Sequence, residues 1–121
     1  MNRNVVVVGA SPKEERYSNK AVKLLAEKGY NVIPVNPAGV EVCGIESVKT
    51  LSEINEPVDT VTMYVNSSRS DAMKDDIIAM KPRRIIFNPG AENESLAVEC
   101  AKNGILTENA CTLILLNTEQ F

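Results

Sequence analysis

NVVVVGASPKEERYSN, residues 4–19, joins a β-branched apolar run to a glycine and then to a polar loop. A run of this kind is typical of a strand buried on both faces of a parallel sheet, and a glycine directly after such a strand is typical of a nucleotide-binding turn. The G-x-G-x-x-G spacing of dinucleotide-binding proteins is missing, because Gly9 stands alone in this stretch. The stretch therefore predicts a buried strand and a ligand-binding turn with a different spacing.

The length and charge of the chain exclude several classes of protein. At 121 residues, we expect a single domain over residues 1–121 that is large enough to bury one core. The net charge of −3 disfavours a protein that holds nucleic acid by neutralising its phosphates. No apolar stretch approaches the roughly 20 residues that span a bilayer, and the apolar run near the start is too short for a signal peptide. We therefore expect a cytoplasmic protein with no nucleic-acid or membrane partner.

The chain contains no histidine. This excludes Ser-His-Asp and Cys-His catalytic sets, a phosphohistidine intermediate and histidine metal ligands. The three cysteines, Cys43, Cys100 and Cys111, cannot all pair within one domain and show no C-x-x-C spacing, so we expect free thiols. Glu92 and Glu108, both expected on the ligand edge, are the only candidates for acid–base chemistry, and nothing supports them as a pair. We predict neither a catalytic residue set nor a metal site.

Short apolar runs alternate with segments of helical periodicity along the chain. Strands are predicted at residues 4–8, 31–35, 60–65, 84–87 and 105–107. This alternation is typical of βαβ units and of a parallel sheet covered by helices on both faces. We therefore predict an α/β fold, a single Rossmann-like doubly wound domain with a five-stranded parallel sheet.

The segments between these strands predict the helices. The first helix is expected over about residues 19–28, with Ser18 as its N-cap and Gly29 just after its end. Further helical segments are expected at TLSEI (50–54, one turn), SSRSDAMKDDIIAM (67–80) and NESLAVECAKNG (93–104). The periodicity of CTLILLNT fits either a helix or a strand, and a short closing helix from Cys111 is favoured. In the segment 93–104, the inward side chains are expected to be Leu96, Ala97, Cys100 and Ala101.

In a doubly wound sheet, the ligand lies outside the carboxyl ends of the strands, where the strand order reverses. The loops at that edge are GASPKEERYS, NPAG, NSSRS, NPGAEN and ENAC. Asn36 stands at the end of the second strand, where a dinucleotide-binding fold would carry Asp or Glu, so NAD is disfavoured. Lys13 and Arg16 lie just before the first helix, where cations and backbone N–H groups suit a phosphate-rich nucleotide.

The residues 5–39, VVVVGASPKEERYSNKAVKLLAEKGYNVIPVNPAG, carry a resemblance to a known family, together with LSEINEPVD, NPGAENESLAVECAKNGI and the late Cys111. The chain resembles the small stand-alone CoA-binding proteins, relatives of the CoA-binding domain of the succinyl-CoA synthetase α chain and of ADP-forming acyl-CoA synthetases. The resemblance implies coenzyme A, or an acyl-CoA, lying across the carboxyl edge of a five-stranded sheet. Because the larger synthetases phosphorylate a histidine and this chain has none, the resemblance implies binding without ligation.

The family pattern also implies which residues meet the ligand. The cofactor-binding residues are expected to be Gly9, Ala10, Ser11, Pro12, Lys13, Arg16, Asn36, Pro37, Asn66, Pro89 and Gly90. By the resemblance, the turn of residues 9–12 would face the diphosphate, Asn36 and Pro37 the adenosine, and Pro89 with Gly90 the far rim.

The chain departs from the family pattern at several positions. Ala38 stands where members often carry a lysine, and Asn66 follows the third strand where a basic residue is common. Arg16 is therefore our hypothesis for the phosphate clamp, with Lys13 as the second candidate. Cys111 lacks the usual preceding charged pair, and packing is favoured over a thiol role.

Other basic residues and the function class complete the sequence-based predictions. For Arg69, the sequence leaves two alternatives, a contact with the ligand and a solvated surface charge. The cluster KPRR, residues 81–84, is expected to be solvated surface. The first function class is a CoA-binding or sensor module. The second is a small NAD(P)- or CoA-thiol-dependent redox enzyme or factor that uses Cys111. The sequence leaves open whether the chain forms a homo-oligomer or pairs with an enzyme chain.

Overall fold

The computed structural model describes residues 2–121. Its main sheet is parallel and five-stranded, in the order β2-β1-β5-β6-β7. The strands are β1 (Asn4–Val8), β2 (Asn31–Val35), β5 (Thr60–Met63), β6 (Arg84–Phe87) and β7 (Leu106–Asn109). The α-helices are α1 (Tyr17–Glu27), α2 (Ser67–Asp71), α3 (Lys74–Met80), α4 (Glu94–Lys102) and α5 (Thr112–Asn117). A 3-10 turn, η1 (Leu51–Glu53), and a small antiparallel hairpin, β3 (Glu41–Val42) with β4 (Ile45–Glu46), complete the fold.

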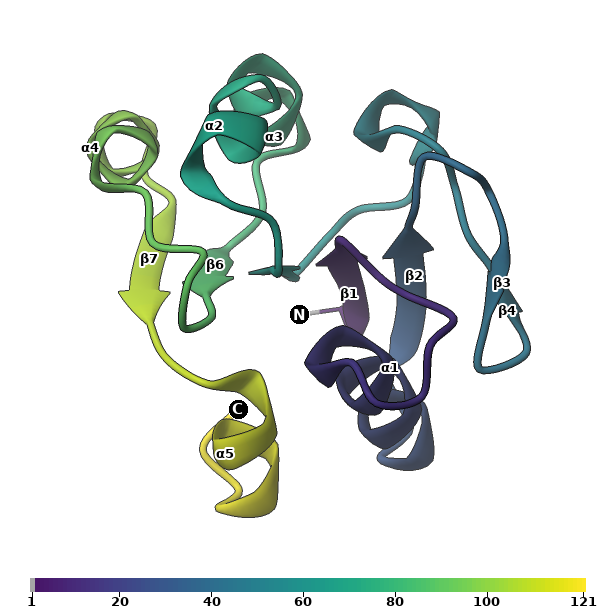
Figure 1. Cartoon of the computed structure of the whole chain (residues 1–121). Helices are drawn as coiled ribbons and strands as arrows, with labels where there is room; N and C mark the ends of the chain where they lie inside the picture. The colour runs from purple at the N-terminus through teal and green to yellow at the C-terminus, as the bar shows by residue number, and fades with distance from the viewer. Residues whose placement is uncertain (1) are drawn as a thin grey trace.

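The helices form a layer on each side of the sheet, which confirms the predicted doubly wound α/β fold. Figure 1 shows α1 and α5 on one side and α2, α3 and α4 on the other. The strand order reverses between β1 and β5, because the chain passes from β1 to β2 and then crosses back to build β5, β6 and β7. The switch point therefore lies between the carboxyl ends of β1 and β5.

The valines of β1 divide between two cores, one on each face of the sheet. Val5 and Val7 pack with Leu25 of α1 and other apolar residues, whereas Val6 and Val8 belong to the core on the opposite face. Successive side chains of a strand point to opposite faces, so a central strand covered on both sides is apolar throughout. The residues Val5 to Val8 are at most 1% exposed. This explains the valine run that opens the chain.

Two helical predictions differ from the structure. The helix α1 begins at Tyr17, not residue 19, with Arg16 as its N-cap, because the first helical hydrogen bond runs from the Lys20 N–H to the Arg16 carbonyl (3.2 Å). Ser18 is buried inside the first turn and does not cap it. The segment 67–80 forms two short helices, because the Met73 N–H bonds the Ser70 carbonyl three residues earlier and breaks the α-helical pattern.

Smaller differences concern strand ends, the hairpin and one side chain. The strand β5 ends at Met63, and β7 covers residues 106–109. The β3–β4 hairpin was not predicted, because strands of two residues carry no readable periodicity; its turn places Cys43 and Gly44 at φ 52° and 78°. Ala101, predicted inward, is exposed on α4. The turn η1 and the closing helix α5 lie where they were predicted.

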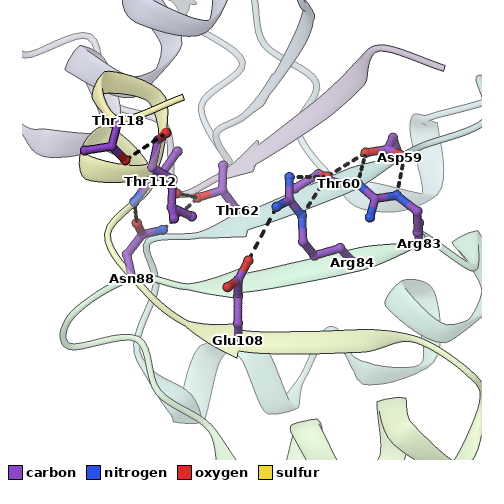
Figure 2. A network of polar contacts seen from close by, with 10 residues as sticks. Asp59, Thr60, Thr62, Arg83, Arg84, Asn88, Glu108, Thr112 and Thr118 are labelled. Carbon is purple, nitrogen blue, oxygen red and sulfur yellow. Dashed lines mark hydrogen bonds and ion pairs between the residues drawn. The ribbon is translucent and has the colours of Figure 1, made fainter. Parts of the chain in front are cut away.

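Arg84 corrects the prediction that residues 81–84 form solvated surface. Its side chain is only 11% exposed, and its guanidinium lies over the Phe121 ring, 4.6 Å from the centroid. It also donates to Glu108 Oε1 at 3.4 Å, as Figure 2 shows. Glu108 is the second-last residue of β7 and lines a pocket together with Glu92, so the two glutamates share this edge as predicted. The contact with Arg84 gives Glu108 a structural partner.

A buried polar network links the carboxyl ends of β5 and β6 to α5 (Figure 2). The Asn88 amide donates to Thr62 Oγ1 (2.7 Å) and to the Met63 carbonyl (2.9 Å), and its oxygen accepts from the Thr112 N–H (2.8 Å). The Thr62 and Thr112 hydroxyls share a further bond of 2.7 Å. These bonds satisfy buried polar groups and hold α5 against the sheet beneath the switch point.

Within residues 2–121, none of the helices has the length and apolar character required to cross a membrane.

Candidate functional site

A pocket of about 270 Å³ lies at the switch point and is called the switch-point pocket below. It is formed by the loops that follow β1, β5 and β6 and by the first turn of α1. Its lining residues are Gly9, Ser11, Arg16, Tyr17, Ser18, Tyr64 and Pro89. Four of the predicted cofactor-binding residues, Gly9, Ser11, Arg16 and Pro89, therefore meet in one pocket.

Gly9 allows the loops after β1 and β5 to approach closely. Its φ of +85° is unfavourable for any residue with a side chain, and a Cβ there would lie 2.9 Å from Val65 Cγ1 and 3.2 Å from the Tyr64 carbonyl carbon. The N–H groups of Gly9 and Ala10 both donate to the Val35 carbonyl, at 3.2 and 3.1 Å. These two N–H groups are thus engaged within the protein, so Gly9 shapes the pocket instead of offering an anion its amide.

Ala10 and Asn36 connect the turn after β1 to the loop after β2. The Ala10 side chain is 2% exposed and packs in the core on the α1 face. The Asn36 amide donates to the Ala10 carbonyl (2.8 Å), and its oxygen accepts from the Ala38 N–H (2.8 Å). A carboxylate could not donate to the Ala10 carbonyl, which gives a structural reason for an amide at this position. Pro37 follows as an exposed residue beside this link.

Ser11 folds the polar loop back onto α1. Its hydroxyl accepts from the Lys13 N–H (3.2 Å), and its carbonyl accepts from the Asn19 amide (2.9 Å). Pro12 and Lys13 are exposed, and neither lines the switch-point pocket. The loop therefore presents Ser11 to the pocket and turns the two following residues away from it.

The amino end of α1 makes the switch-point pocket electropositive. Arg16 is the N-cap, no side chain caps the helix, and its first turn contains no acidic residue. Tyr17 and Ser18, the first two residues of the helix, line the pocket. The unpaired N–H groups and the dipole at a helix amino end favour an anion, and the Arg16 guanidinium adds a full positive charge.

The remaining predicted residues lie around the far rim. Gly90, with φ +91°, donates its N–H to Glu92 Oε1 (2.9 Å) and does not line the pocket. The Asn66 side-chain oxygen caps α2 by accepting from the Arg69 N–H (3.0 Å). Asn66 thus has a structural role, and Arg69 lies within α2, outside the pocket lining.

Sequence reasoning missed Tyr17, Ser18 and Tyr64 as pocket residues. Tyr17 would have been found had the helix start been placed correctly, since the first turn of a helix at this edge faces the ligand. Tyr64 has no sequence signal, because an aromatic residue after a strand usually indicates packing. Its hydroxyl is buried without a hydrogen-bond partner among the described residues, and burial raises the pKa of Tyr64 to about 12.

The cysteines are free thiols, as predicted: Cys43 is exposed, Cys100 is buried and Cys111 is half-buried. Cys111 is the N-cap of α5 and does not line the switch-point pocket. Burial raises the pKa of the Cys100 thiol, which keeps it protonated and unreactive.

A five-stranded Rossmann-like domain with an electropositive pocket at its switch point defines the class of this protein. The chain belongs to the CoA binding domain family, whose family model matches residues 3–117. This confirms the resemblance to small CoA-binding proteins that the sequence motifs carry.

The chain is also similar to individual proteins whose names give no function. The uncharacterized protein YneT of Bacillus subtilis (strain 168) is 31% identical over 77 residues, which cover 64% of this chain and 57% of that protein. The chain thus matches little more than half the length of YneT. A crystal structure of an uncharacterized protein has a TM-score of 0.88 at 36% identity and covers 100% of this chain and 99% of its own.

A larger enzyme contains the same fold. The dinucleotide-forming acetyl-coenzyme A synthetase 1 of Ca. Korarchaeum cryptofilum, in complex with phosphate and ADP, has a TM-score of 0.75 at 21% identity. The match covers 89% of this chain and 25% of that chain. At this identity the likeness concerns the fold alone.

Proposed function

We propose that this chain is a single CoA-binding domain over residues 1–121 that binds coenzyme A or an acyl-CoA through its phosphates at the switch-point pocket. It acts as a binding or sensor domain without ligase chemistry of its own. The observation that carries the proposal is the uncapped amino end of α1, which faces this pocket together with Arg16. The diphosphate of CoA is the anion that this arrangement suits.

The roles of the pocket residues follow from their places. Ser11, Arg16 and Ser18 have polar groups that can meet the diphosphate, whereas Tyr17 and Pro89 supply apolar walls. The loop of Asn36 and Pro37 borders the adenosine side, and Asn66 and Gly90 border the rim. Gly9 and Ala10 hold the shape of the turn.

The end of β2 supports CoA over NAD. A dinucleotide-binding fold uses an acidic residue there to accept the ribose hydroxyls. In this chain, Asn36 occupies that position, and both polar atoms of its side chain are engaged by Ala10 and Ala38. An NAD ribose would find no free carboxylate at this place.

Ligand-dependent stability tests the proposal directly. CoA, dephospho-CoA, acetyl-CoA, NAD and NADP are each added to the purified chain, and the melting temperature is measured. A ligand at 100 times its dissociation constant stabilises the fold by about 2.7 kcal/mol, so CoA should raise the melting temperature and NAD should not. A shift with NAD as large as that with CoA would contradict the proposal.

The variant Arg16→Ala tests whether CoA binds in the switch-point pocket. Loss of a charge-assisted hydrogen bond to a phosphate costs about 1.5–3 kcal/mol, so CoA affinity should fall roughly tenfold to a hundredfold. Lys13→Ala is the matched control, because Lys13 lies on the same loop but does not line the pocket. Equal effects of the two substitutions in calorimetric titrations would place the diphosphate elsewhere.

A further inference from the structure

A second cavity, of about 580 Å³, lies between α1 and the β3–β4 hairpin and is called the hairpin cavity below. Its lining residues are Pro12, Glu14, Asn19, Lys20, Lys23 and Cys43. Figure 1 shows why these segments meet: the loop after β1 passes toward the hairpin before α1 begins. The same loop lines the switch-point pocket with Ser11 and the hairpin cavity with Pro12, so the two cavities are neighbours.

A stripe of cations on α1 connects the two cavities. Arg16, Lys20 and Lys23 are spaced four and three residues apart, which places them on one face of the helix. Arg16 lines the switch-point pocket, and the two lysines line the hairpin cavity. The Lys20 ammonium also lies 5.5 Å from the centre of the Tyr17 ring, which borders the switch-point pocket.

The protein does not itself neutralise this stripe. None of the ion pairs within residues 2–121 involves Arg16, Lys20 or Lys23. Cations near the amino end of a helix oppose its dipole, and the first turn of α1 has no acidic residue to offset them. Glu14 is the one carboxylate that lines the hairpin cavity, against two ammonium groups. The stripe therefore carries positive charge that an external anion would stabilise.

We propose that Lys20 and Lys23 form a second phosphate subsite, which binds the 3′-phosphate of CoA while the switch-point pocket binds the diphosphate. This inference rests on the proposed function. CoA carries both groups on one ribose, so their two subsites must be neighbours, as these cavities are. Lys49, from the segment after β4, packs its side chain against Gly39 of the loop after β2. That loop carries no cation of its own, because Ala38 follows Pro37. The lysines of α1 supply that charge from the other side of the loop after β1.

Titration calorimetry with CoA and with dephospho-CoA tests the subsite. The double variant Lys20→Ala/Lys23→Ala should bind CoA roughly tenfold to a hundredfold more weakly than the wild type, with a smaller loss at high salt. Dephospho-CoA lacks the 3′-phosphate, and its affinity should stay within about twofold. Lys74→Ala/Lys102→Ala is the control, because it removes the same charge from α3 and α4 on the opposite side of the sheet.

The outcomes separate this inference from the proposed function. A wild-type chain that binds neither ligand overturns the proposed function. Wild-type binding of CoA with an unchanged double variant overturns only the lysine subsite. An equal loss for CoA and dephospho-CoA also overturns it, because the lysines would then meet the diphosphate. A loss as large in the Lys74→Ala/Lys102→Ala control would show a general charge effect and would overturn it as well.

Discussion

Gly9→Ala should destabilise the fold more than the same change at another glycine of positive φ. A side chain at φ +85° is strained by about 1–2 kcal/mol. The new Cβ would also lie 2.9 Å from Val65 Cγ1 and 3.2 Å from the Tyr64 carbonyl carbon, and such overpacking typically costs about 1–3 kcal/mol. Val65 is 5% exposed, and its β-branched side chain has little freedom to move aside. The total loss should be about 2–5 kcal/mol.

Gly104→Ala is the control for backbone strain alone. Its φ is +74°, and a Cβ there would meet nothing within 4 Å, so the loss should be only about 1–2 kcal/mol. Both variants and the wild type are unfolded in urea and followed by circular dichroism, and the free energies of unfolding are compared at unchanged m-value. If Gly9→Ala lowers the free energy of unfolding no more than Gly104→Ala does, the close approach of the two loops does not restrict the side chain that fits at position 9.

Two pH dependences follow from individual side chains. Asp59 accepts a two-pronged hydrogen bond from Arg83 (2.8 and 3.0 Å), which lowers the pKa of its carboxyl below the ordinary 3.8. As the pH falls, Asp59 is protonated in the unfolded chain before it is protonated in the folded chain. The stabilisation is therefore present at neutral pH and is lost as the pH falls below about 4. Acid titration of stability should show that Asp59→Asn lacks this loss; an identical profile for wild type and variant would contradict it. Since Arg83 is 43% exposed, the difference should be only about 0.5–1 kcal/mol. The pKa of Tyr64, raised by burial to about 12 from 10.0, predicts the opposite dependence. Above pH 10 the unfolded tyrosine loses its proton first, so wild-type stability should fall relative to Tyr64→Phe, by about 2–3 kcal/mol in full. This is ruled out if the free energies of unfolding of the two proteins change by the same amount from about pH 8 to about pH 11.

The sheet could be predicted from the sequence because its strands are buried on both faces. The bounds of β1, β2 and β6 are those predicted, since continuous apolar runs between polar turns leave little choice. The ends of β5 and β7 differ from the predicted ends by one or two residues, because the exact end of a strand is poorly marked in an apolar pattern. The β3–β4 hairpin depends on the positive φ of Cys43 and Gly44, a backbone state that no periodicity reveals.

The site could be predicted only where topology alone brings residues together. Gly9, Ser11, Arg16 and Pro89 follow the strands β1 and β6, and parallel strands place their carboxyl ends at one edge. Tyr64 was missed because its role depends on the space left under Gly9, which is a property of packing. Arg84 was misplaced for a similar reason, whereas Lys81 and Arg83 beside it are exposed, as predicted. The partners of Arg84 are Glu108 on a neighbouring strand and Phe121 at the chain end, far from it in sequence.

Asn36 shows how ligand class and local fold depend on one side chain. The absence of an acid at the end of β2 first disfavoured NAD, and the structure supplies a cause for that absence. The Asn36 amide must donate to the Ala10 carbonyl, at 2.8 Å, to hold the turn after β1 in place. A carboxylate at this position would lose that bond and face the carbonyl oxygen instead. An acidic residue suited to a ribose would therefore disturb the turn that shapes the switch-point pocket. The same contact that forms the proposed phosphate site thus works against dinucleotide binding.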